Sequence, residues 1–298
     1  MRRNRLPTRP RISVVVISRD EGVRLRRTVD NLAGTLPPAS EILVVDDGSV
    51  DGSPDFLAGR RRGPARLWRT ANLGVARARN EGARRTQGDV LVFADAHLSL
   101  DAAWWKPLVE LLANPKTGAA APAIADIRHT EKRGYGLSLP RPDLEADWLP
   151  RQYSRPYAVP ILPGCCLAMR RDTFDKTGGF DGGMLCSGGV DNELGLRFWL
   201  LGYEMVVDPG TEVQHLFRRR FPYPVTWETV LHNRLRLALT HLGARRTAKV
   251  VRELRGYRAF PAALVLAIDG GVASRRAQLL ARRKYDDDWF FERFGIEW

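Results

Sequence analysis

The sequence contains little cysteine. Its 298 residues include three, namely Cys165, Cys166 and Cys186. An adjacent pair followed by a distant third matches no standard zinc spacing, and an odd number argues against a disulfide framework. We therefore expect all three to be small buried hydrophobic residues.

Long apolar segments are also missing. Residues 14–17 form an apolar run of strand length that is followed at once by Arg19 and Asp20, whereas a membrane-spanning helix needs about 20 apolar residues. The start of the chain lacks the apolar core and cleavage site of a secretory signal. We therefore expect a cytoplasmic protein.

Acidic residues are too few to balance the basic ones, and the formal net charge is +13. Such a charge fits nucleic-acid binding, attraction to an anionic membrane surface, attraction of phosphorylated substrates, or a solvated surface with no specific partner. Zinc-finger spacings and aromatic RNA-binding signatures are absent, so we expect no nucleic-acid partner. Peripheral contact with an anionic membrane stays open, and the oligomeric state is undetermined.

The first two hundred residues alternate predicted strands with predicted helices, which is typical of an α/β fold. Strands are predicted at residues 11–18, 41–45, 90–94, 205–207 and 212–217, and helices at 22–32, 74–85, 191–201 and 227–242. Between residues 121 and 160 the pattern favours loops and short edge strands. We divide the chain into a flexible basic lead-in (1–10), a main domain (11–243, in halves 11–120 and 121–243) and a helical extension (244–298).

The triplet Asp95-Ala96-His97 is the most informative motif. It follows the apolar run at residues 90–94, which is typical of a central parallel strand. Side chains two residues apart point to the same side of a strand, and open α/β sheets bind ligands at the carboxyl ends of their strands. The triplet therefore predicts a divalent-cation site that could neutralise a diphosphate leaving group.

His215 is a candidate third ligand, because Asp95 and His97 leave such a site short of protein donors. A lone strand histidine is more often structural. If His215 completes the site, the mixed oxygen and nitrogen donors suit Mn²⁺ better than Mg²⁺.

Two further segments lie where a nucleotide could bind. Asp47, in the motif at residues 46–49, follows a predicted buried strand and could accept a hydrogen bond from a uracil N–H or a ribose hydroxyl; an ordinary Asp-Gly turn is the alternative. The segment at residues 72–80 enters a helix through Gly74. Arg77 within it could pair with a phosphate or lie on a solvated helix face.

A pair of acidic residues, Asp191 and Glu193, follows two glycines at a predicted helix start. Either could act as a general base. Alternatively, Asp191 could be the helix N-cap.

Together these motifs resemble family 2 glycosyltransferases with the GT-A fold, and most of all the catalytic domain of polypeptide N-acetylgalactosaminyltransferases. The resemblance spans about residues 11–240. The segments that carry it are residues 14–21, 44–49, 74–79, 95–97, 188–199, 215–218, 222–223 and 233–234. It implies a Rossmann-like, mixed but mainly parallel sheet flanked by helices.

The resemblance also assigns roles to residues. It implies that Asp47 contacts the nucleoside, that Arg77 lies near the nucleotide, and that Arg218 and Tyr223 belong to a mobile loop that closes over the donor. Asp95, His97 and His215 would bind Mn²⁺ with the diphosphate of UDP. Further nucleotide-sugar contacts would be Ser18, Glu21, Gly74, Asp95, Gly164 and Gly189.

We therefore expect an enzyme that moves a sugar from UDP to a hydroxyl of a peptide, glycan or small molecule, with retention of configuration. This chain has Val190-Asp191 where the N-acetylgalactosaminyltransferases have Glu-Asn, and Ser187 where they have tryptophan, so the donor sugar stays open. An inverting transferase with Asp191 as base is the first alternative. An inactive GT-A-like binding module and a basic nucleic-acid or membrane-surface protein are the others.

Overall fold

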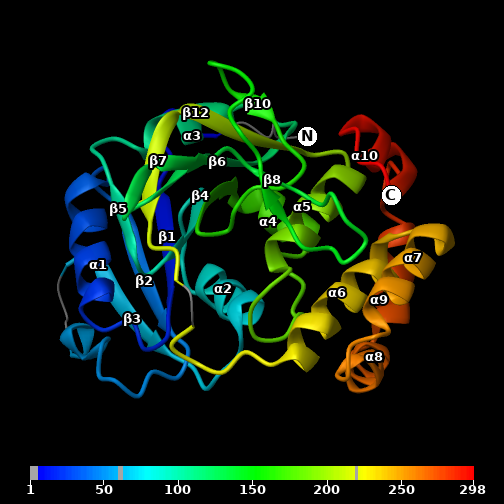
Figure 1. Cartoon of the computed structure of the whole chain (residues 1–298). Coiled ribbons are helices and arrows are strands. Elements are labelled where there is room, and N and C mark those ends of the chain that lie inside the picture. The colour runs from blue at the N-terminus through cyan, green and yellow to red at the C-terminus, as the bar shows by residue number, and fades with distance from the viewer. Residues whose placement is uncertain (1–5, 60–62, 219–220) are drawn as a thin grey trace.

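The computed structural model of the chain describes residues 6–59, 63–218 and 221–298 (Figure 1). Residues 1–5 of the predicted lead-in lie outside these ranges. The strands are β1 Ile12–Ser18, β2 Glu41–Asp46, β3 Ala65–Arg69, β4 Val90–Asp95, β5 Leu98–Leu100, β6 Thr117–Asp126, β7 His129–Gly134, β8 Leu137–Ser138, β9 Asp147–Trp148, β10 Tyr157–Ala158, β11 Cys166–Arg170 and β12 Glu204–His215. The helices are α1 Val23–Thr35, α2 Val75–Arg84, α3 Trp105–Leu111, α4 Arg171–Thr177, α5 Val190–Leu200, α6 Trp227–His241, α7 Ala244–Leu254, α8 Phe260–Asp269, α9 Val272–Leu280 and α10 Asp287–Arg293.

Ten of the described strands form a mixed sheet in the order β10-β12-β6-β11-β4-β1-β2-β3, with β5 beside β12 and β7 beside β6, and β8 pairs with β9 in a separate two-stranded sheet. Strands β4, β1, β2 and β3 are mutually parallel, and β11 runs antiparallel to both β4 and β6. Helices cover the sheet, and α6 to α10 gather on one side of the molecule (Figure 1). The predicted mixed α/β fold with a helical C-terminal extension is confirmed.

The apolar run at residues 90–94 is buried on both faces of the sheet, as predicted. Val90, Val92 and Ala94 belong to one hydrophobic cluster, and Leu91 and Phe93 belong to another. The first cluster packs α1 and α3 on one face of the sheet, and the second packs α2, α5 and α6 on the other. Because β4 is an inner strand between β1 and β11, its carboxyl end lies in the middle of the row of strand ends.

The prediction of loops and short strands from residue 121 is wrong for residues 121–126. They complete β6, whose residues 117–125 are all buried. The segment is rich in alanine, which has a low strand propensity, and this composition hid the strand. Earlier in the same strand, a Cβ at Gly118 would lie 2.5 Å from a ring carbon of Phe198, so that position requires glycine.

A second correction concerns β12, which is one strand where two were predicted. Its pairing with β6 shifts register between Asp208 and Glu212, so an irregularity, rather than a chain break, lies between the two predicted strands. The predicted boundary at residues 120 and 121 falls inside β6, whereas the one at 243 and 244 falls between α6 and α7. Among the described residues, no helix is both long enough and apolar enough to cross a membrane.

Candidate active site

A cleft of about 350 Å³ opens at the carboxyl ends of β1, β2 and β4. Ser18 ends β1, Asp47 follows β2, and Asp95 ends β4. Twelve of the predicted site residues line the cleft: Ser18, Glu21, Asp47, Gly74, Asp95, His97, Gly164, Gly189, Asp191, His215, Arg218 and Tyr223. Two others, Arg77 and Glu193, do not.

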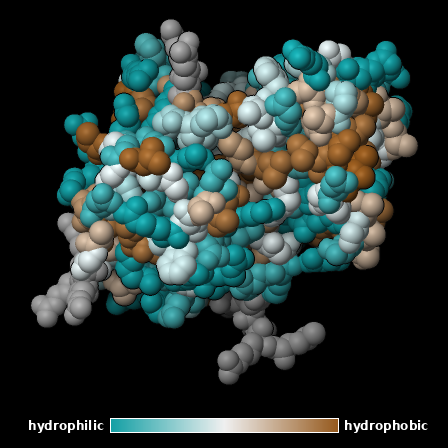
Figure 2. All heavy atoms as spheres, turned by 90° about the horizontal axis from the view of Figure 1, so that it is seen from below, coloured by the Kyte–Doolittle hydropathy of each residue, from teal (hydrophilic) through white to brown (hydrophobic). Residues whose placement is uncertain are grey.

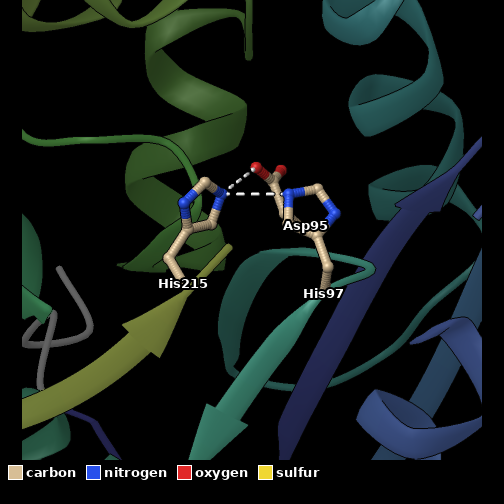
Figure 3. Close-up of side chains that lie close together, drawn as sticks. All are labelled: Asp95, His97 and His215. Carbon is tan, nitrogen blue, oxygen red and sulfur yellow. Dashed lines mark hydrogen bonds and ion pairs between the residues drawn. The ribbon is translucent and has the colours of Figure 1, made fainter. Parts of the chain in front are cut away.

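The centre of the cleft holds a cluster of Asp95, His97 and His215 (Figure 3). One candidate ligand atom from each of them lies within 4.8 Å of the others. The two imidazole Nε2 atoms are 3.1 Å apart, and Nε2 of His215 lies 3.3 Å from Oδ2 of Asp95. Donors that bind one ion at right angles from about 2.1 Å lie about 3 Å apart. The three side chains therefore fit a single divalent cation, and their mixed donors suit Mn²⁺.

The outer nitrogen of His97 has a carboxylate partner. Nδ1 of His97 lies 3.1 Å from Oε2 of Glu21, and Arg218 forms an ion pair with the same oxygen. A carboxylate on the far nitrogen of a metal-binding histidine fixes the tautomer that presents the other nitrogen to the ion. Glu21 thus orients His97 toward the cluster. Nδ1 of His215 is buried and has no hydrogen-bond partner among the described residues.

The charge of Asp95 is stabilised by its neighbours. Burial raises its pKa, but the hydrogen bond from His215 and the charges of His97, His215 and Arg79 outweigh burial and lower the pKa to about 2. The carboxylate is therefore ionised at neutral pH, as a metal ligand must be.

Asp47 holds the loop that leads into α2. Its Oδ1 accepts hydrogen bonds from the Thr70 hydroxyl at 2.8 Å and the Leu73 N–H at 2.6 Å, and its Oδ2 accepts one from the Gly74 N–H at 2.8 Å. Gly74 has φ +81°, and a Cβ there would lie 2.9 Å from the backbone nitrogen of Cys186. Asp47 and Gly74 thereby shape the floor of the cleft between β2 and α2.

Asp191 faces the cleft from the first turn of α5, but it does not cap that helix. The N-cap is Gly189, at φ 73°, so the predicted N-cap role of Asp191 is wrong. Oδ1 of Asp191 accepts a hydrogen bond from Arg79 at 3.0 Å, and Oδ2 accepts one from the Gly164 N–H at 2.9 Å. A Cβ at Gly164 would lie 2.1 Å from Oδ1 of Asp191, so only glycine allows this contact.

Arg79, which belongs to the family pattern but was given no role by the sequence, lines the cleft. It is buried, lies 3.6 Å from Oδ1 of Asp95, and donates a 2.7 Å hydrogen bond to the Gly164 carbonyl. Arg77, predicted to lie near the nucleotide, is exposed and donates through Nε to the Gly182 carbonyl at 2.6 Å. The helical period could have identified Arg79 as the inward-facing arginine, because it shares a face of α2 with the buried Ala76 and Ala83.

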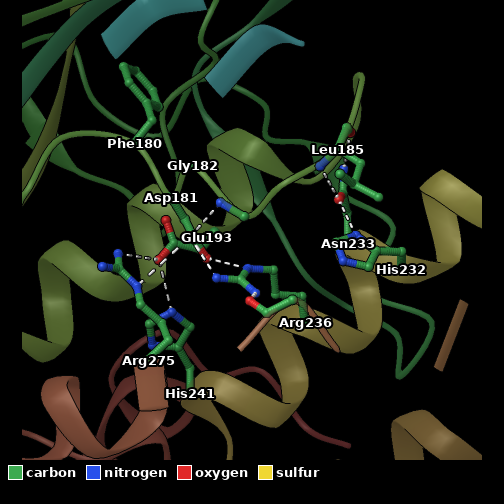
Figure 4. A network of polar contacts seen from close by, with 12 residues as sticks. Phe180, Asp181, Gly182, Leu185, Glu193, His232, Asn233, Arg236, His241 and Arg275 are labelled. Atoms are coloured by element: carbon green, nitrogen blue, oxygen red, sulfur yellow. Dashed lines mark hydrogen bonds and ion pairs between the residues drawn. The ribbon is translucent and has the colours of Figure 1, made fainter. Parts of the chain in front are cut away.

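Glu193 lies away from the cleft, in the junction of α5 with α6 and α9 (Figure 4). It is 1% exposed, pairs with Arg197 through Nε at 2.7 Å, and lies 3.0 Å from Nε2 of His241. Burial raises its pKa, but the charges of Arg197 and His241 outweigh burial and lower it. The predicted role as a general base has no support in this position, because a base must reach the substrate.

Tyr223 and Arg218 line the cleft from the segment between β12 and α6. Burial raises the pKa of Tyr223 to about 12, so the phenol keeps its proton at neutral pH. The Arg19 guanidinium lies 5.1 Å from the centre of its ring. The pairing of Arg218 with Glu21 brings this segment against the metal cluster.

A family model described as "Glycosyl transferase family 2" matches residues 13–178. The matched region contains β1 to β11 and thus most of the cleft. The chain belongs to glycosyl transferase family 2. His215, Arg218 and Tyr223 lie after the matched region, so the family model alone does not include the third candidate ligand.

Curated relatives extend the family likeness beyond that region. The chain is 33% identical over 262 residues to human polypeptide N-acetylgalactosaminyltransferase 15, a match that covers 79% of this chain and 40% of the relative. It is 32% identical to polypeptide N-acetylgalactosaminyltransferase 11 of Xenopus tropicalis, over 78% of this chain and 43% of that relative. The chain therefore spans about two fifths of the length of these relatives.

Solved structures show the same fold at lower identity. A structure of GalNAc-T7 with UDP, GalNAc and Mn²⁺ superposes with a TM-score of 0.80 at 21% identity, and the match covers 98% of this chain and 57% of that one. A mannosyltransferase from Pyrobaculum calidifontis in complex with GDP-Man and Mn²⁺ superposes with a TM-score of 0.56, over 93% of this chain and 80% of that one. The family 2 chain thus has the predicted GT-A fold.

Arg77 and Arg79, both in α2, give a matched pair of variants. We expect Arg79→Met to reduce donor turnover at least about tenfold, because it removes charge-assisted hydrogen bonds within the cleft. Arg77→Met should leave turnover within about twofold, since Arg77 does not line the cleft. Steady-state donor hydrolysis by the two purified variants checks this difference; equal losses would contradict the assignment of Arg79.

Proposed function

We propose that this family 2 protein is a metal-dependent glycosyltransferase that moves a sugar from a UDP-linked donor to a hydroxyl acceptor. The observation that carries the proposal is the convergence of Asp95, His97 and His215 at the strand ends of a cleft. The relatives named as N-acetylgalactosaminyltransferases and the neighbour solved with UDP and Mn²⁺ support the nucleotide and the metal.

The chain's own residues supply binding, orientation and exclusion of water. Asp95, His97 and His215 would hold Mn²⁺, which when bound withdraws charge from the departing diphosphate as a Lewis acid. Asp47 and Gly74 shape the nucleoside end of the cleft, and Arg79 and Asp191 lie at its sugar end. Arg218 and Tyr223 would cover the donor, and exclusion of water limits its wasteful hydrolysis.

A thermal-shift panel of nucleotide sugars with and without Mn²⁺ tests the proposal. We expect UDP-linked donors at about 100 times their dissociation constant to stabilise the protein by about 2.7 kcal/mol, which raises Tm by about 5–10 °C, and to do so only with metal. Because one structural neighbour was solved with GDP-Man, the panel includes GDP and dTDP donors. Stabilisation by these donors alone would refute the uridine assignment.

We further propose that the anomeric configuration is retained. An inverting reaction would require Asp191 to deprotonate the acceptor hydroxyl, whereas both of its carboxylate oxygens already accept hydrogen bonds from Arg79 and Gly164. Without an enzymic base, the departing phosphate oxygen takes the acceptor proton as the new glycosidic bond forms. Asp191 would then orient the sugar.

The configuration of the product tests retention directly. We expect the first product formed from a UDP-α-sugar to carry an α linkage, because Asp191, the candidate base, is held by Arg79 and Gly164. NMR coupling constants of the anomeric proton distinguish the two outcomes. A β linkage would overturn retention and assign Asp191 as the base of an inverting enzyme.

A further inference from the structure

Helix α8 presents an apolar face to solvent. Its first nine residues, 260–268, contain no charged side chain. Val265, Leu266 and Ile268 are 56%, 42% and 59% exposed, whereas Ala263 and Ala267 are buried. Figure 2 shows hydrophobic atoms gathered on the right of the molecule, the side on which Figure 1 places α6 to α9. An exposed apolar patch of this kind marks an interaction surface.

Two aromatic side chains lie at the start of this helix. Tyr257 precedes it by one turn, and its carbonyl accepts a hydrogen bond from the Phe260 N–H. Its ring lies 5.3 Å from that of Trp227, and the two residues are 39% and 57% exposed. Tryptophan and tyrosine are enriched at the level of lipid headgroups, because the ring is apolar and its N–H or O–H group can still contact water.

Three arginines precede the apolar face. Arg252, Arg255 and Arg258 are exposed, and no carboxylate of the described residues forms an ion pair with any of them. By contrast, Arg276 in α9 turns inward and donates to the carbonyls of Leu239 and Leu242. Arg252, Arg255 and Arg258 therefore lie in the last turn of α7 and the segment that leads into α8, close in sequence to its apolar residues.

We infer that the α8 face, defined as Trp227, Tyr257, Val265, Leu266 and Ile268 with the flanking Arg252, Arg255 and Arg258, docks on an anionic lipid bilayer. Apolar side chains beside basic ones bind such a surface by burial and by attraction to headgroups together. A second copy of the chain fits less well, because a twofold interface would bring the same arginines together. The net charge of +13 adds long-range attraction to anionic lipid.

Vesicle co-sedimentation tests this docking. We expect the protein to bind vesicles of phosphatidylcholine mixed with phosphatidylserine, to bind phosphatidylcholine vesicles much more weakly, and to be released by salt. Arg255→Gln with Arg258→Gln should lower the partition coefficient about 30-fold. Val265→Ser with Ile268→Ser should lower it at least about tenfold.

Matched variants control for charge and exposure. Arg24→Gln with Arg27→Gln removes the same charge from exposed positions of α1, on the opposite side of the molecule (Figure 1). Val50→Ser alters an apolar side chain that is 92% exposed in a distant loop. Both controls should bind vesicles within about threefold of the unmodified protein, since neither touches the α8 face.

Three results would overturn the inference: no sedimentation with anionic vesicles, equal binding to both kinds of vesicle, or a dimer in solution that Val265→Ser with Ile268→Ser dissociates. Thermal shifts with a UDP-sugar and Mn²⁺, measured on the same samples without lipid, show whether each variant is folded. They also separate failure of docking from failure of the proposed enzymatic function.

Discussion

Replacing His215 with alanine is expected to lower Mn²⁺-dependent turnover of a UDP-sugar at least about 100-fold, because loss even of a residue that only orients a ligand costs about 10–100-fold. His215 is the one member of the cluster that comes from β12, far in sequence from Asp95 and His97. Without it, two of the three protein donors remain. Donor hydrolysis titrated with Mn²⁺ measures the loss and should show a weaker apparent metal affinity.

His129→Ala is the matched control for this variant. His129 lies in β7, and its side chain is 55% exposed, so its loss should change neither turnover nor metal affinity measurably. If both variants kept full activity at limiting Mn²⁺, His215 would not be a ligand. If both lost it equally, the effect of His215→Ala would be nonspecific.

Replacing Glu193 with alanine is expected to lower the free energy of unfolding by about 3–5 kcal/mol, the usual cost of removing one member of a buried ion pair. Arg197 would remain in place with 1% of its side chain exposed, and His241 would lose its carboxylate partner. Urea unfolding at pH 7 measures the change. Glu131→Ala, at a carboxylate that is 70% exposed, should cost less than about 0.5 kcal/mol.

The stabilisation contributed by Glu193 should also change with pH in a definite direction. The pKa of Glu193 is lowered from 4.5 in the folded protein, so its ionised form stabilises the fold above pH 4.5, and this contribution is lost as the pH falls through the folded pKa. The stability gap between the unmodified protein and Glu193→Gln should therefore be full at pH 7 and shrink in acid. A gap that is constant with pH would contradict the ion-pair role.

The sequence predicted the centre of the site better than its surroundings. Asp95 and His97 could be placed because an apolar strand and its two-residue period fix where they point. The contact of His215 with them depends on how β12 pairs with β5 and β6, which periodicity does not determine. The shortage of protein donors made His215 a candidate, and the family resemblance supported it.

The wrong predictions from the sequence have physical causes. Residues 121–126 were missed as a strand because they include three alanines and Pro122, and neither residue type favours a strand. Glu193 was assigned chemistry because it lies two residues from Asp191, yet on a helix that spacing turns the two side chains to different faces. The same helical period separates Arg77 from Arg79.

The most direct measurement of the central claim is anomalous diffraction at the manganese edge from crystals soaked with Mn²⁺ and UDP. We predict a single strong peak in the cleft, within bonding distance of Asp95, His97 and His215. A peak elsewhere on the protein, or no peak in the cleft under conditions that support donor turnover, would contradict the metal-dependent mechanism.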